Sequence, residues 1–454
     1  MSFQCLRMLI RCLAAVGATC FMLMHSSVWS IELPAVSADD TTPLIINVPG
    51  LTPELDPLYQ EVLDLLLDGD KEEAAHAAEA LLTAFRREYS SDSTLLATPS
   101  LYLGLLQLDI GETFAALSHL DRAVQLIERQ HGRFDLRLIA PLRGLAIAHI
   151  ETGRRESAVT ALRRAQHLTH RHMGVYNTNQ LPILDMLLTV DKGRAGMTDT
   201  LSTFNLKVHE EAFGEDDPRI VPALLRMAQY MANKGQRTPN RPSMAFRSKY
   251  FRDSLGHSSR AIQILEDTYG KDDPRIIEVL RIVAETKLKR GLGKSDAVAA
   301  IKRARDIVVA NAGSDVSDVA YAKVELADIY TLWDDHRATE AYREAWDSIP
   351  DDPRYEALRH ELFGEPKQIS TDSFTMRLRE RPWRIGRVNY LEMEYVVRAD
   401  GRARRFEMLE GNVPLRARDQ LRAKLRRARF RPRMEDGQVV ETGAIIVRRE
   451  YTLY

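Results

Sequence analysis

The pattern of apolar and polar residues divides the chain into a long helical body and a short tail that contains strands. In the body, the apolar run 145–150 predicts a helix that ends near Gly153, and 157–169 predicts its partner across a tight turn. Near Val388 the pattern changes to strict alternation, which is the period of a half-buried strand. We therefore expect residues 51–364 to be almost wholly helical and the only substantial sheet to lie after Gly386.

The body repeats itself along the chain. Eight residues, several of them Gly or Pro, recur 42 positions later. The first copy is Pro99, Gly111, Ala116, Leu120, Arg122, Ala123, Leu126 and Gly132, and the second is Pro141, Gly153, Ala158, Leu162, Arg164, Ala165, Leu168 and Gly174. A further echo joins 213–219 (FGEDDPR) to 269–275 (YGKDDPR). Such self-similarity predicts an α-solenoid, in which each helical hairpin buries its apolar face against its neighbours.

Pairs of alanines suggest how closely the two helices of a hairpin pack. Each pair stands two helical turns apart on one helix face. The pairs are Ala116 and Ala123, Ala158 and Ala165, Ala297 and Ala304, and Ala338 and Ala345. Small side chains at these positions allow the helix axes to approach to about 8–10 Å.

The tail predicts the order strand, strand, helix, strand. An Asp-Gly turn at 400–401 joins the first two strands. Asn412 and Pro414 suit the start of a helix, and after a second Asp-Gly turn the β-branched and aromatic residues of 439–451 predict the last strand. The apolar stripe of the helix is Ala417, Leu421, Leu425 and Ala428. The fold class is thus mainly α, a solenoid followed by a small α+β domain of order β-β-α-β.

Two spacings in the body resemble the tetratricopeptide repeat. The gap from Gly111 to Ala123 is repeated from Gly153 to Ala165. The longer period and the Gly-x-Asp-Asp-Pro-Arg linkers resemble the kinesin-light-chain-like variety of that repeat, although its aromatic positions and closing proline are mostly missing. The resemblance implies about seven hairpins that present a groove to a protein segment.

The tail resembles the C-terminal domain of TonB. The residues that carry the resemblance are Arg387-Val388, Tyr395-Val396-Val397, Asp400-Gly401-Arg402, Arg429-Phe430-Arg431-Pro432 and Asp436-Gly437-Gln438-Val439. In that family the domain adds a strand to a segment of an outer-membrane receptor, so the resemblance implies peptide capture at a sheet edge rather than catalysis. A TonB also needs a retained membrane helix and usually a Pro/Lys-rich spacer, and we expect neither here.

The charge of the tail suggests an anionic partner. Residues 386–454 are rich in arginine and net positive, whereas the whole chain has a formal net charge of −1. Four arginines share one face of the predicted helix, and the terminal strand, within 442–451, can lie at a sheet edge with unpaired backbone groups. The candidate partner-binding residues are Arg418, Arg422, Arg426, Arg429, Ile446, Arg448 and Tyr451. The same edge could pair two copies of the chain into a homodimer.

The N-terminal segment suggests export. Arg7 and Arg11 precede an apolar run, 12–24, which is short for a membrane span of about 20 residues. We expect residues 1–38 to be a cleaved signal peptide and leader and 39–50 a linker, which places the mature protein in the periplasm. The alternative is an uncleaved anchor in the inner membrane. All three cysteines of the chain, Cys5, Cys12 and Cys20, lie in this segment, so the mature chain needs no disulfide.

Two other segments interrupt the pattern. Residues 236–257 form an insertion rich in basic and aromatic residues. The insertion is interpreted either as a solvated loop with an overlong helix or as an element that grips a partner. Residues 365–385 are expected to link the solenoid (51–364) to the tail domain (386–454).

No motif predicts catalysis or a cofactor. Paired acids at 216–217, 272–273, 334–335 and 351–352 precede helices, where carboxylates cap N-termini. His167, His170 and His172 are typical of a surface helix end, because only the first two share a face. We expect no enzyme activity, no metal, no cofactor and no nucleic-acid partner.

Together these features predict a non-enzymatic adaptor of the periplasm. The solenoid would bind one protein, and the tail would dock another envelope protein, such as a segment of an outer-membrane receptor. One alternative is a TonB-family energy transducer for outer-membrane transport with a retained N-terminal anchor. The other is an envelope component that binds anionic glycolipid through the arginine face.

Overall fold

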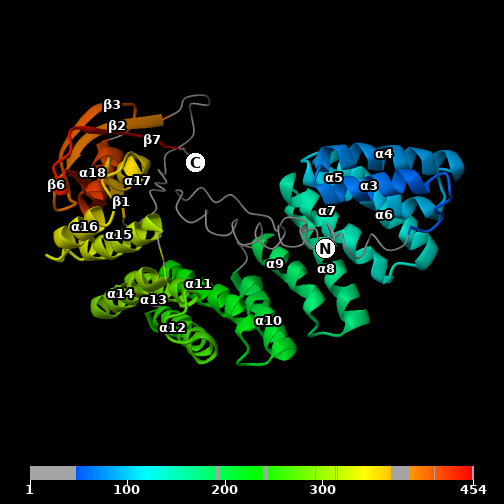
Figure 1. The fold of residues 1–454 in the computed structure, drawn as a ribbon, viewed down its shortest axis with the longest axis horizontal. Helices are drawn as coiled ribbons and strands as arrows, with labels where there is room; N and C mark the ends of the chain where they lie inside the picture. Colours follow the sequence, from blue (N-terminus) through cyan, green and yellow to red (C-terminus); the bar gives the residue numbers. More distant parts are fainter. Residues whose placement is uncertain are drawn as a thin grey trace, which may run out of the picture. The chain divides into compact units, whose positions relative to one another are not determined.

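The computed structural model describes residues 48–190, 195–238, 244–291, 293–311, 313, 315–369, 389–413 and 415–451. The expected signal peptide and leader, and all but the end of the linker 39–50, lie outside these residues. The chain divides into two compact units, Met1–Leu201 and Ser202–Tyr454, and each is described by itself (Figure 1).

The first unit is built from helical hairpins (blue to teal in Figure 1). Its helices are α3 (Asp56–Asp68), α4 (Lys71–Glu88), α5 (Ala97–Asp109), α6 (Thr113–His131), α7 (Ile139–Glu151), α8 (Arg155–Met173) and α9 (Leu181–Val190). Short 3₁₀ turns precede three of them: η2 (Thr94–Leu96), η3 (Leu136–Leu138) and η4 (Thr178–Gln180). Helices α3 and α4, α5 and α6, and α7 and α8 pack as consecutive pairs.

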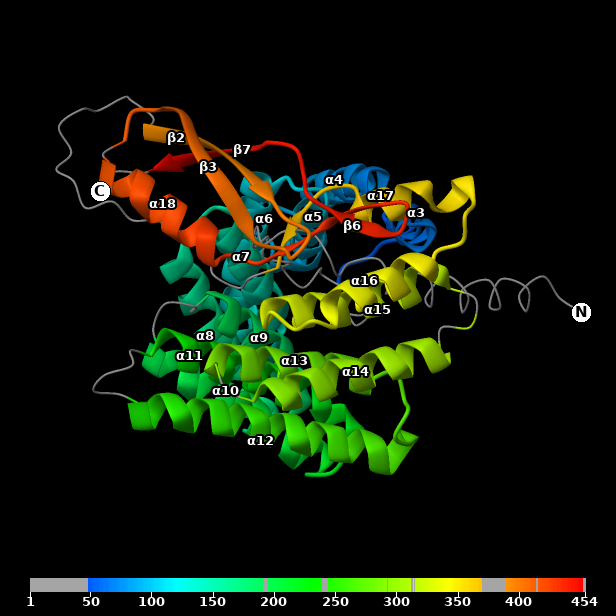
Figure 2. The ribbon, with the colours of Figure 1, turned by 90° about the vertical axis from the view of Figure 1, so that its left-hand side faces the viewer.

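The second unit combines further hairpins with a small domain that contains the sheet. Its helices are α11 (Val221–Arg237), α12 (Met244–Tyr269), α13 (Ile276–Arg290), α14 (Lys294–Asn311), α15 (Val316–Leu332), α16 (Ala338–Asp347), α17 (Glu356–Phe363) and α18 (Leu415–Arg427), with η5 (Pro218–Ile220) and η6 (Pro353–Tyr355). Helix α10 (Ala195–Phe213) spans the boundary between the units. Figure 2 shows the α12–α16 helices of this unit lying side by side.

The strands lie at the C-terminal end of the chain. They are β1 (Lys367–Gln368), β2 (Asn389–Val397), β3 (Ala403–Gly411), β4 (Phe430–Arg431), β5 (Arg433–Glu435), β6 (Gln438–Val440) and β7 (Ile445–Tyr451). Between residues 51 and 364 the described residues form helices and turns and contain no strand. The expected mainly helical solenoid and the small C-terminal sheet region are therefore confirmed.

Glycines end the first helix of the hairpins where a left-handed residue is needed. Gly111 and Gly153 have φ values of 81° and 73°, which residues with a side chain rarely adopt. Their N–H groups donate to the carbonyls of Leu108 (3.1 Å) and Ile150 (3.0 Å). These bonds close the last helical turn and reverse the chain into the second helix, which explains why Gly recurs with the repeat.

The recurrent alanines of α6 and α8 are fully buried on the second helix of their hairpins. Ala116, Ala123, Ala158 and Ala165 are each 0% exposed. The two helices of a hairpin approach closely at Gly104 in α5, where an added Cβ would lie 2.7 Å from Cγ of Leu120 in α6. Small residues at these positions therefore set the separation of the helices.

Arginines link the second helices of successive hairpins. Each of three arginines binds a glutamate on the preceding second helix and a backbone carbonyl in the loop that follows that helix. They are Arg164 with Glu128 and the carbonyl of Arg133, Arg260 with Glu210 and the carbonyl of Glu215, and Arg303 with Glu266 and the carbonyl of Lys271. Each of these three guanidinium groups thus ties its own hairpin to the second helix and the loop of the hairpin before it.

The C-terminal sheet has the strand order β3-β2-β7, with both neighbours antiparallel to β2. Helix α18 lies along one face (Figure 2). Its stripe packs on the inward side chains of β2, as the alternation predicted; the cluster contains Leu391, Met393, Tyr395, Val397, Ala417, Leu421 and Leu425. The β-β-α-β order is interrupted by the short strands β4, β5 and β6 between the helix and β7.

A buried ion pair fastens this sheet domain to the last hairpins. Arg431 of β4 is 2% exposed, and it donates through Nε and Nη2 to both carboxylate oxygens of Asp328 in α15 (3.0 and 2.7 Å). Its Nη1 donates to the carbonyl of Leu362 (3.2 Å), and Tyr342 donates to the same carboxylate (2.8 Å). Burial raises the pKa of Tyr342, so this hydroxyl stays a donor. The buried guanidinium is therefore well satisfied.

A second ion cluster and a strand pair extend the same contact. Asp334, which follows α15, accepts hydrogen bonds from Arg429 (2.9 Å) and pairs with Arg402 (2.9 Å). Strand β1 pairs with β4, and Met434 of β5 belongs to the apolar core of the hairpins. The stretch expected as a linker, 365–385, hence begins with a strand, and its residues from 370 lie outside the described ones. The tail does not stand apart as a separate module, because its short strands complete the core of the last hairpins.

Enlarging the buried alanines should destabilise the solenoid. We expect Ala123→Leu and Ala165→Leu each to lower the free energy of unfolding by about 1–3 kcal/mol, because the close helix contact has no room for the added atoms. Ala80→Leu on α4, where the side chain is exposed, should change it by about 0.5 kcal/mol or less. Urea unfolding followed by circular dichroism measures these values, and equal stability of all three variants would contradict the proposed packing.

Removing the partner of Arg431 should be costly. Asp328→Ala leaves a buried guanidinium without its counter-charge, and we expect a loss of about 3–5 kcal/mol in the unfolding of the second unit. Asp334→Ala is the matched control, because its side chain is 41% exposed and the loss should be about 1 kcal/mol or less. Similar losses in both variants, measured by denaturant unfolding, would show that Arg431 does not depend on Asp328.

Candidate interaction surfaces

Strand β7 forms one edge of the C-terminal sheet. Among the described strands it pairs only with β2, in a uniform register that runs from Asn389 opposite Tyr451 to Tyr395 opposite Ile445. The sequence predicted an edge strand within 442–451. The strand begins at Ile445, so it falls inside that range.

The hydrogen bonds of β2 show which way its backbone groups face. Tyr390 bonds Asn412 on the β3 side, through its carbonyl (3.1 Å) and its N–H (2.8 Å). Val397 bonds Thr442 on the β7 side, through its carbonyl (2.9 Å) and its N–H (2.8 Å). Backbone groups alternate in direction along a strand, so the odd-numbered residues of 391–397 face β7.

This alternation determines which residues of β7 face outward. The partners of the odd-numbered residues are Ile445, Val447 and Arg449. These three residues use their backbone groups toward β2, and Ile446 and Arg448 direct their N–H and C=O groups away from the sheet. The edge therefore presents alternating donors and acceptors to the outside.

The side chains of Ile446 and Arg448 lie on the sheet face opposite α18. Ile446 is 60% exposed. Arg448 donates to Glu392 directly across the strand pair (3.1 Å), and its guanidinium carbon lies 4.2 Å from the centre of the Tyr390 ring. The backbone of Tyr451 pairs with Asn389, while its side chain is outside the described part. The residues whose backbone groups point outward, Ile446 and Arg448, thus carry one exposed apolar and one cationic side chain on that sheet face.

The four arginines predicted to share one helix face do not have the same surroundings, because some are exposed and others contact the rest of the protein. Arg422 and Arg426 are exposed on α18, and the described residues place no carboxylate within ion-pair distance of them. Arg418 is half-buried. Arg429 belongs to the cluster with Asp334 and so contributes to the contact with the hairpins. Arg422 and Arg426 therefore form an exposed positive pair on α18.

The insertion is largely an extension of a helix. Within 236–257, helix α12 begins at Met244, and residues 239–243 lie outside the described ones. Phe251 is 1% exposed, and its ring fills the space beside Gly235 in α11. Arg247 donates to the carbonyl of Lys289 in α13 (3.3 Å). These contacts favour the interpretation of an overlong helix packed on its neighbours.

The paired acids stabilise the turns that precede helices, and two of them, Asp217 and Asp352, are the N-caps of 3₁₀ turns. The second acid of each pair accepts the backbone N–H two residues later, at 2.8–3.1 Å; these acids are Asp217, Asp273, Asp335 and Asp352. Hydrogen bonds from the Arg219 side chain, and then from its backbone N–H, lower the pKa of Asp217 to about 2. A carboxylate held ionised in this way suits a cap rather than a general acid.

The three histidines of α8 contact different groups. His170 bonds Gln180 (2.7 Å), His172 bonds the carbonyl of Phe134 (2.6 Å), and the His167 ring lies 6.3 Å from the Phe134 ring. Within the described ranges no cluster of His, Cys, Asp and Glu has the arrangement of a metal site. None of the helices in the described part of the chain is long and apolar enough to span a bilayer.

Sequence reasoning missed the residue that matters most for this domain. Arg431 lies within the Arg-Phe-Arg-Pro motif, yet its partner Asp328 is distant in the chain, and no local pattern joins them. Sequence reasoning also missed Arg86 in α4. If the residues one hairpin upstream of α6 had been aligned with the repeat, Arg86 would have stood at the position of Glu128.

The solved structures that resemble this chain include the three that follow. The crystal structure of BtubC (BKLC) from P. vanneervenii is 15% identical, with 57% of this chain and 93% of that chain covered and a TM-score of 0.40. A Podosopora anserina putative kinesin light chain with nearly identical TPR-like repeats is 12% identical, with 57% and 97% covered and a TM-score of 0.29. The apo form of the quorum sensor NprR from B. thuringiensis is 13% identical, with 66% and 90% covered and a TM-score of 0.34.

The family comparison concerns the first unit. No curated protein matches the chain. The family match, which falls on a tetratricopeptide repeat, indicates no catalytic family. Repeats of this kind are typically scaffolds for protein–protein interaction. Residues 95–166, which comprise α5, α6, α7 and the first part of α8, match the tetratricopeptide repeat family.

Proposed function

We propose that this protein is a non-enzymatic adaptor of the cell envelope. Its solenoid holds one protein partner, and its C-terminal sheet captures an extended segment of another by adding a strand to β7. The observation that carries the proposal is the outward row of backbone donors and acceptors at Ile446 and Arg448. An edge of this kind is the structural requirement for strand addition.

The way the sheet domain is held supports this role. Its contacts with α15, α16 and α17 come from β4, β5 and β6 and from the turn at Gly401, whose backbone lies against Phe430 and Thr331. Among the described residues these contacts leave the β7 edge accessible. The ion pairs of Arg431 and Arg429 hold the sheet in place, so a captured segment would be coupled to the last hairpins.

The compartment belongs to the same proposal and is supported by the sequence. The basic and apolar N-terminal segment favours export, and the TonB-like residues of the tail favour a partner in the envelope, such as an outer-membrane receptor segment. A retained anchor would instead favour the energy transducer. Mass spectrometry of the mature N-terminus separates the two, since a chain that keeps residues 1–38 supports the transducer.

A second candidate rests on Arg422 and Arg426. Their exposed guanidinium groups, without ion pairs in the described part of the tail, suit an anionic surface such as a glycolipid headgroup. Pairing of β7 edges between two copies of the chain is a further outcome that the edge allows.

Proline at the edge should block capture. We expect Ile446→Pro to weaken recovery of the partner by about tenfold or more, because it removes an outward donor and places a ring where the added strand would lie. The fold should persist, since this N–H faces away from β2. Ile446→Ala, which keeps the N–H, should retain most of the capture. The measurement is photo-crosslinking from position 448 of the full chain in cells.

The controls make the result decisive. Loss of crosslinking in the alanine variant as large as in the proline variant would assign the contact to the side chain. Unchanged crosslinking in both variants would exclude strand addition at β7. Circular dichroism of the purified variants checks that the sheet and solenoid remain folded.

Charge reversal on α18 should affect the rate of capture rather than its stability. We expect Arg422→Glu with Arg426→Glu to slow association and to flatten its dependence on salt, because exposed charges mainly steer encounter. Surface plasmon resonance with the crosslinked partner at several salt concentrations measures both quantities. A large increase in the dissociation rate would contradict this assignment. Salt-sensitive binding to glycolipid vesicles that the variant loses would favour the second candidate.

A further inference from the structure

Helix α4 lacks the glutamate that α6, α10 and α12 each supply to an arginine of the next second helix. At three junctions an arginine of one second helix binds a glutamate of the preceding second helix, as Arg164 binds Glu128. In α4 the corresponding position is Arg86, which stands as far from Gly69 as Glu128 stands from Gly111. Helix α4 therefore brings a guanidinium group to the place where the repeat would supply a carboxylate.

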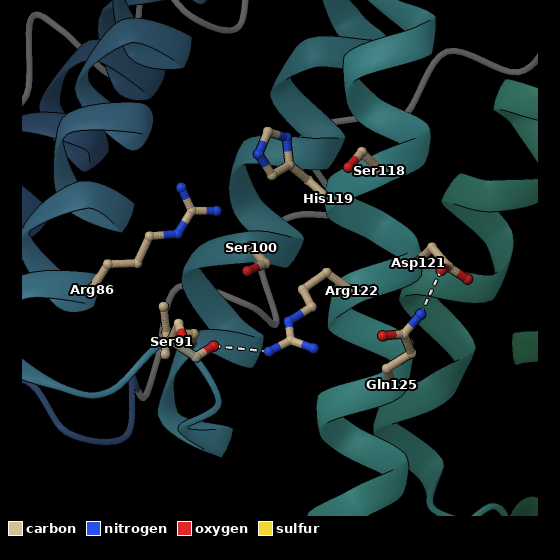
Figure 3. A pocket seen from close by; sticks show the side chains of 9 residues that line it. Arg86, Ser91, Ser100, Ser118, His119, Asp121, Arg122 and Gln125 are labelled. Carbon is tan, nitrogen blue, oxygen red and sulfur yellow. Dashed lines mark hydrogen bonds between the residues drawn. The ribbon is translucent and has the colours of Figure 1, made fainter.

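A cavity of about 480 Å³ lies at this place, between α4, α5 and α6 (Figure 3). Arg86 reaches toward it from α4, and Arg122 reaches toward it from α6. Ser91, Ser100 and Ser118 also line it. Two guanidinium forks and several hydroxyl groups around one space form a set of donors for an oxygen anion.

Most donors of these two arginines are not in use. Arg122 donates through Nη2 alone, to the carbonyl of Ser91 (2.8 Å) and to Asp92 (2.9 Å). Its Nε and Nη1 have no acceptor among the described residues. Arg86 likewise has no hydrogen bond or ion pair with any residue that the structure describes. A ligand in the cavity could therefore accept hydrogen bonds from the whole guanidinium group of Arg86 and from Nε and Nη1 of Arg122.

The other titratable groups leave this positive charge in place. Burial, together with the nearby Arg86, lowers the pKa of His119, whose Nδ1 bonds Gln107 (2.8 Å), so His119 is neutral at neutral pH. Asp121 at the rim accepts a hydrogen bond from Gln125 (2.6 Å). Among the described residues neither Arg86 nor Asp121 has an ion-pair partner in the cavity wall, and Asp121 is engaged by Gln125.

We propose that this cavity binds the carboxylate of an acidic side chain from a protein partner, held between Arg86 and Arg122. The partner would supply in trans the group that Glu128, Glu210 and Glu266 supply within the chain. A planar carboxylate matches the bidentate guanidinium fork. The assignment deepens the adaptor proposal by giving the solenoid an acidic partner, and it stands on the first unit without any dependence on β7.

The test uses the full mature chain and defined probes. Isothermal titration calorimetry compares a hexaglutamate peptide with a hexaglutamine peptide and with inorganic phosphate. We expect saturable binding of hexaglutamate and none of hexaglutamine. Binding of phosphate without binding of hexaglutamate would overturn the assignment to an acidic side chain and indicate a phosphate site.

Three variants locate the binding. Arg86→Glu recreates the missing glutamate, so it should abolish binding and raise the midpoint of thermal unfolding through a new pair with Arg122. Arg86→Gln should weaken binding about tenfold or more. Arg87→Glu makes the same charge change on an exposed neighbour outside the cavity, and binding should persist.

Two results would overturn the proposal. One is the absence of saturable hexaglutamate binding to the unmodified chain. The other is a loss in Arg87→Glu as large as in Arg86→Glu, which would indicate attraction to charge in general rather than a site. Neither result bears on strand addition, which the Ile446→Pro variant tests separately.

Discussion

The C-terminal half of this protein depends on one constraint, the satisfaction of a buried guanidinium group. Arg431 carries a full charge out of water, and only a carboxylate with correct geometry and further acceptors can offset that cost. Asp328 and the carbonyl of Leu362 provide them, and Tyr342 holds the carboxylate in turn. Because these groups come from α15, α16, α17 and β4, the sheet domain and the last hairpins form one structure.

The same chemistry, in a more exposed form, connects three pairs of successive hairpins. An arginine that binds both a glutamate and a loop carbonyl joins two successive repeats at two points, which restricts their rotation as well as their separation. In α4 Arg86 stands at the position where α6 has Glu128, and a cavity lies beside it. A repeat protein can therefore create a binding site by changing the sign of one charge, because the scaffold on both sides already positions the remaining partner.

The two proposed interactions use different physics. Strand addition at β7 depends on backbone groups, so it tolerates many partner sequences and selects mainly for an extended segment. The cavity between α4 and α6 depends on a charge-assisted fork, so it selects for an acid. An adaptor that combines both can hold two partners by unrelated criteria, one at each unit of the chain.

The sequence alone determined the features that depend on near neighbours. Helical periodicity, the turn glycines, the Asp-Gly hairpin at 400–401 and the alternation in β2 predicted the solenoid and the sheet region, because each arises within a few residues. The sequence also singled out Arg418, Arg422, Arg426 and Arg429 as one face. Only the tertiary structure separated Arg429, which pairs with Asp334, from the exposed Arg422 and Arg426. The roles of Arg431 and Arg86 were likewise decided by the fold, since an ion pair depends on which distant groups it brings within reach.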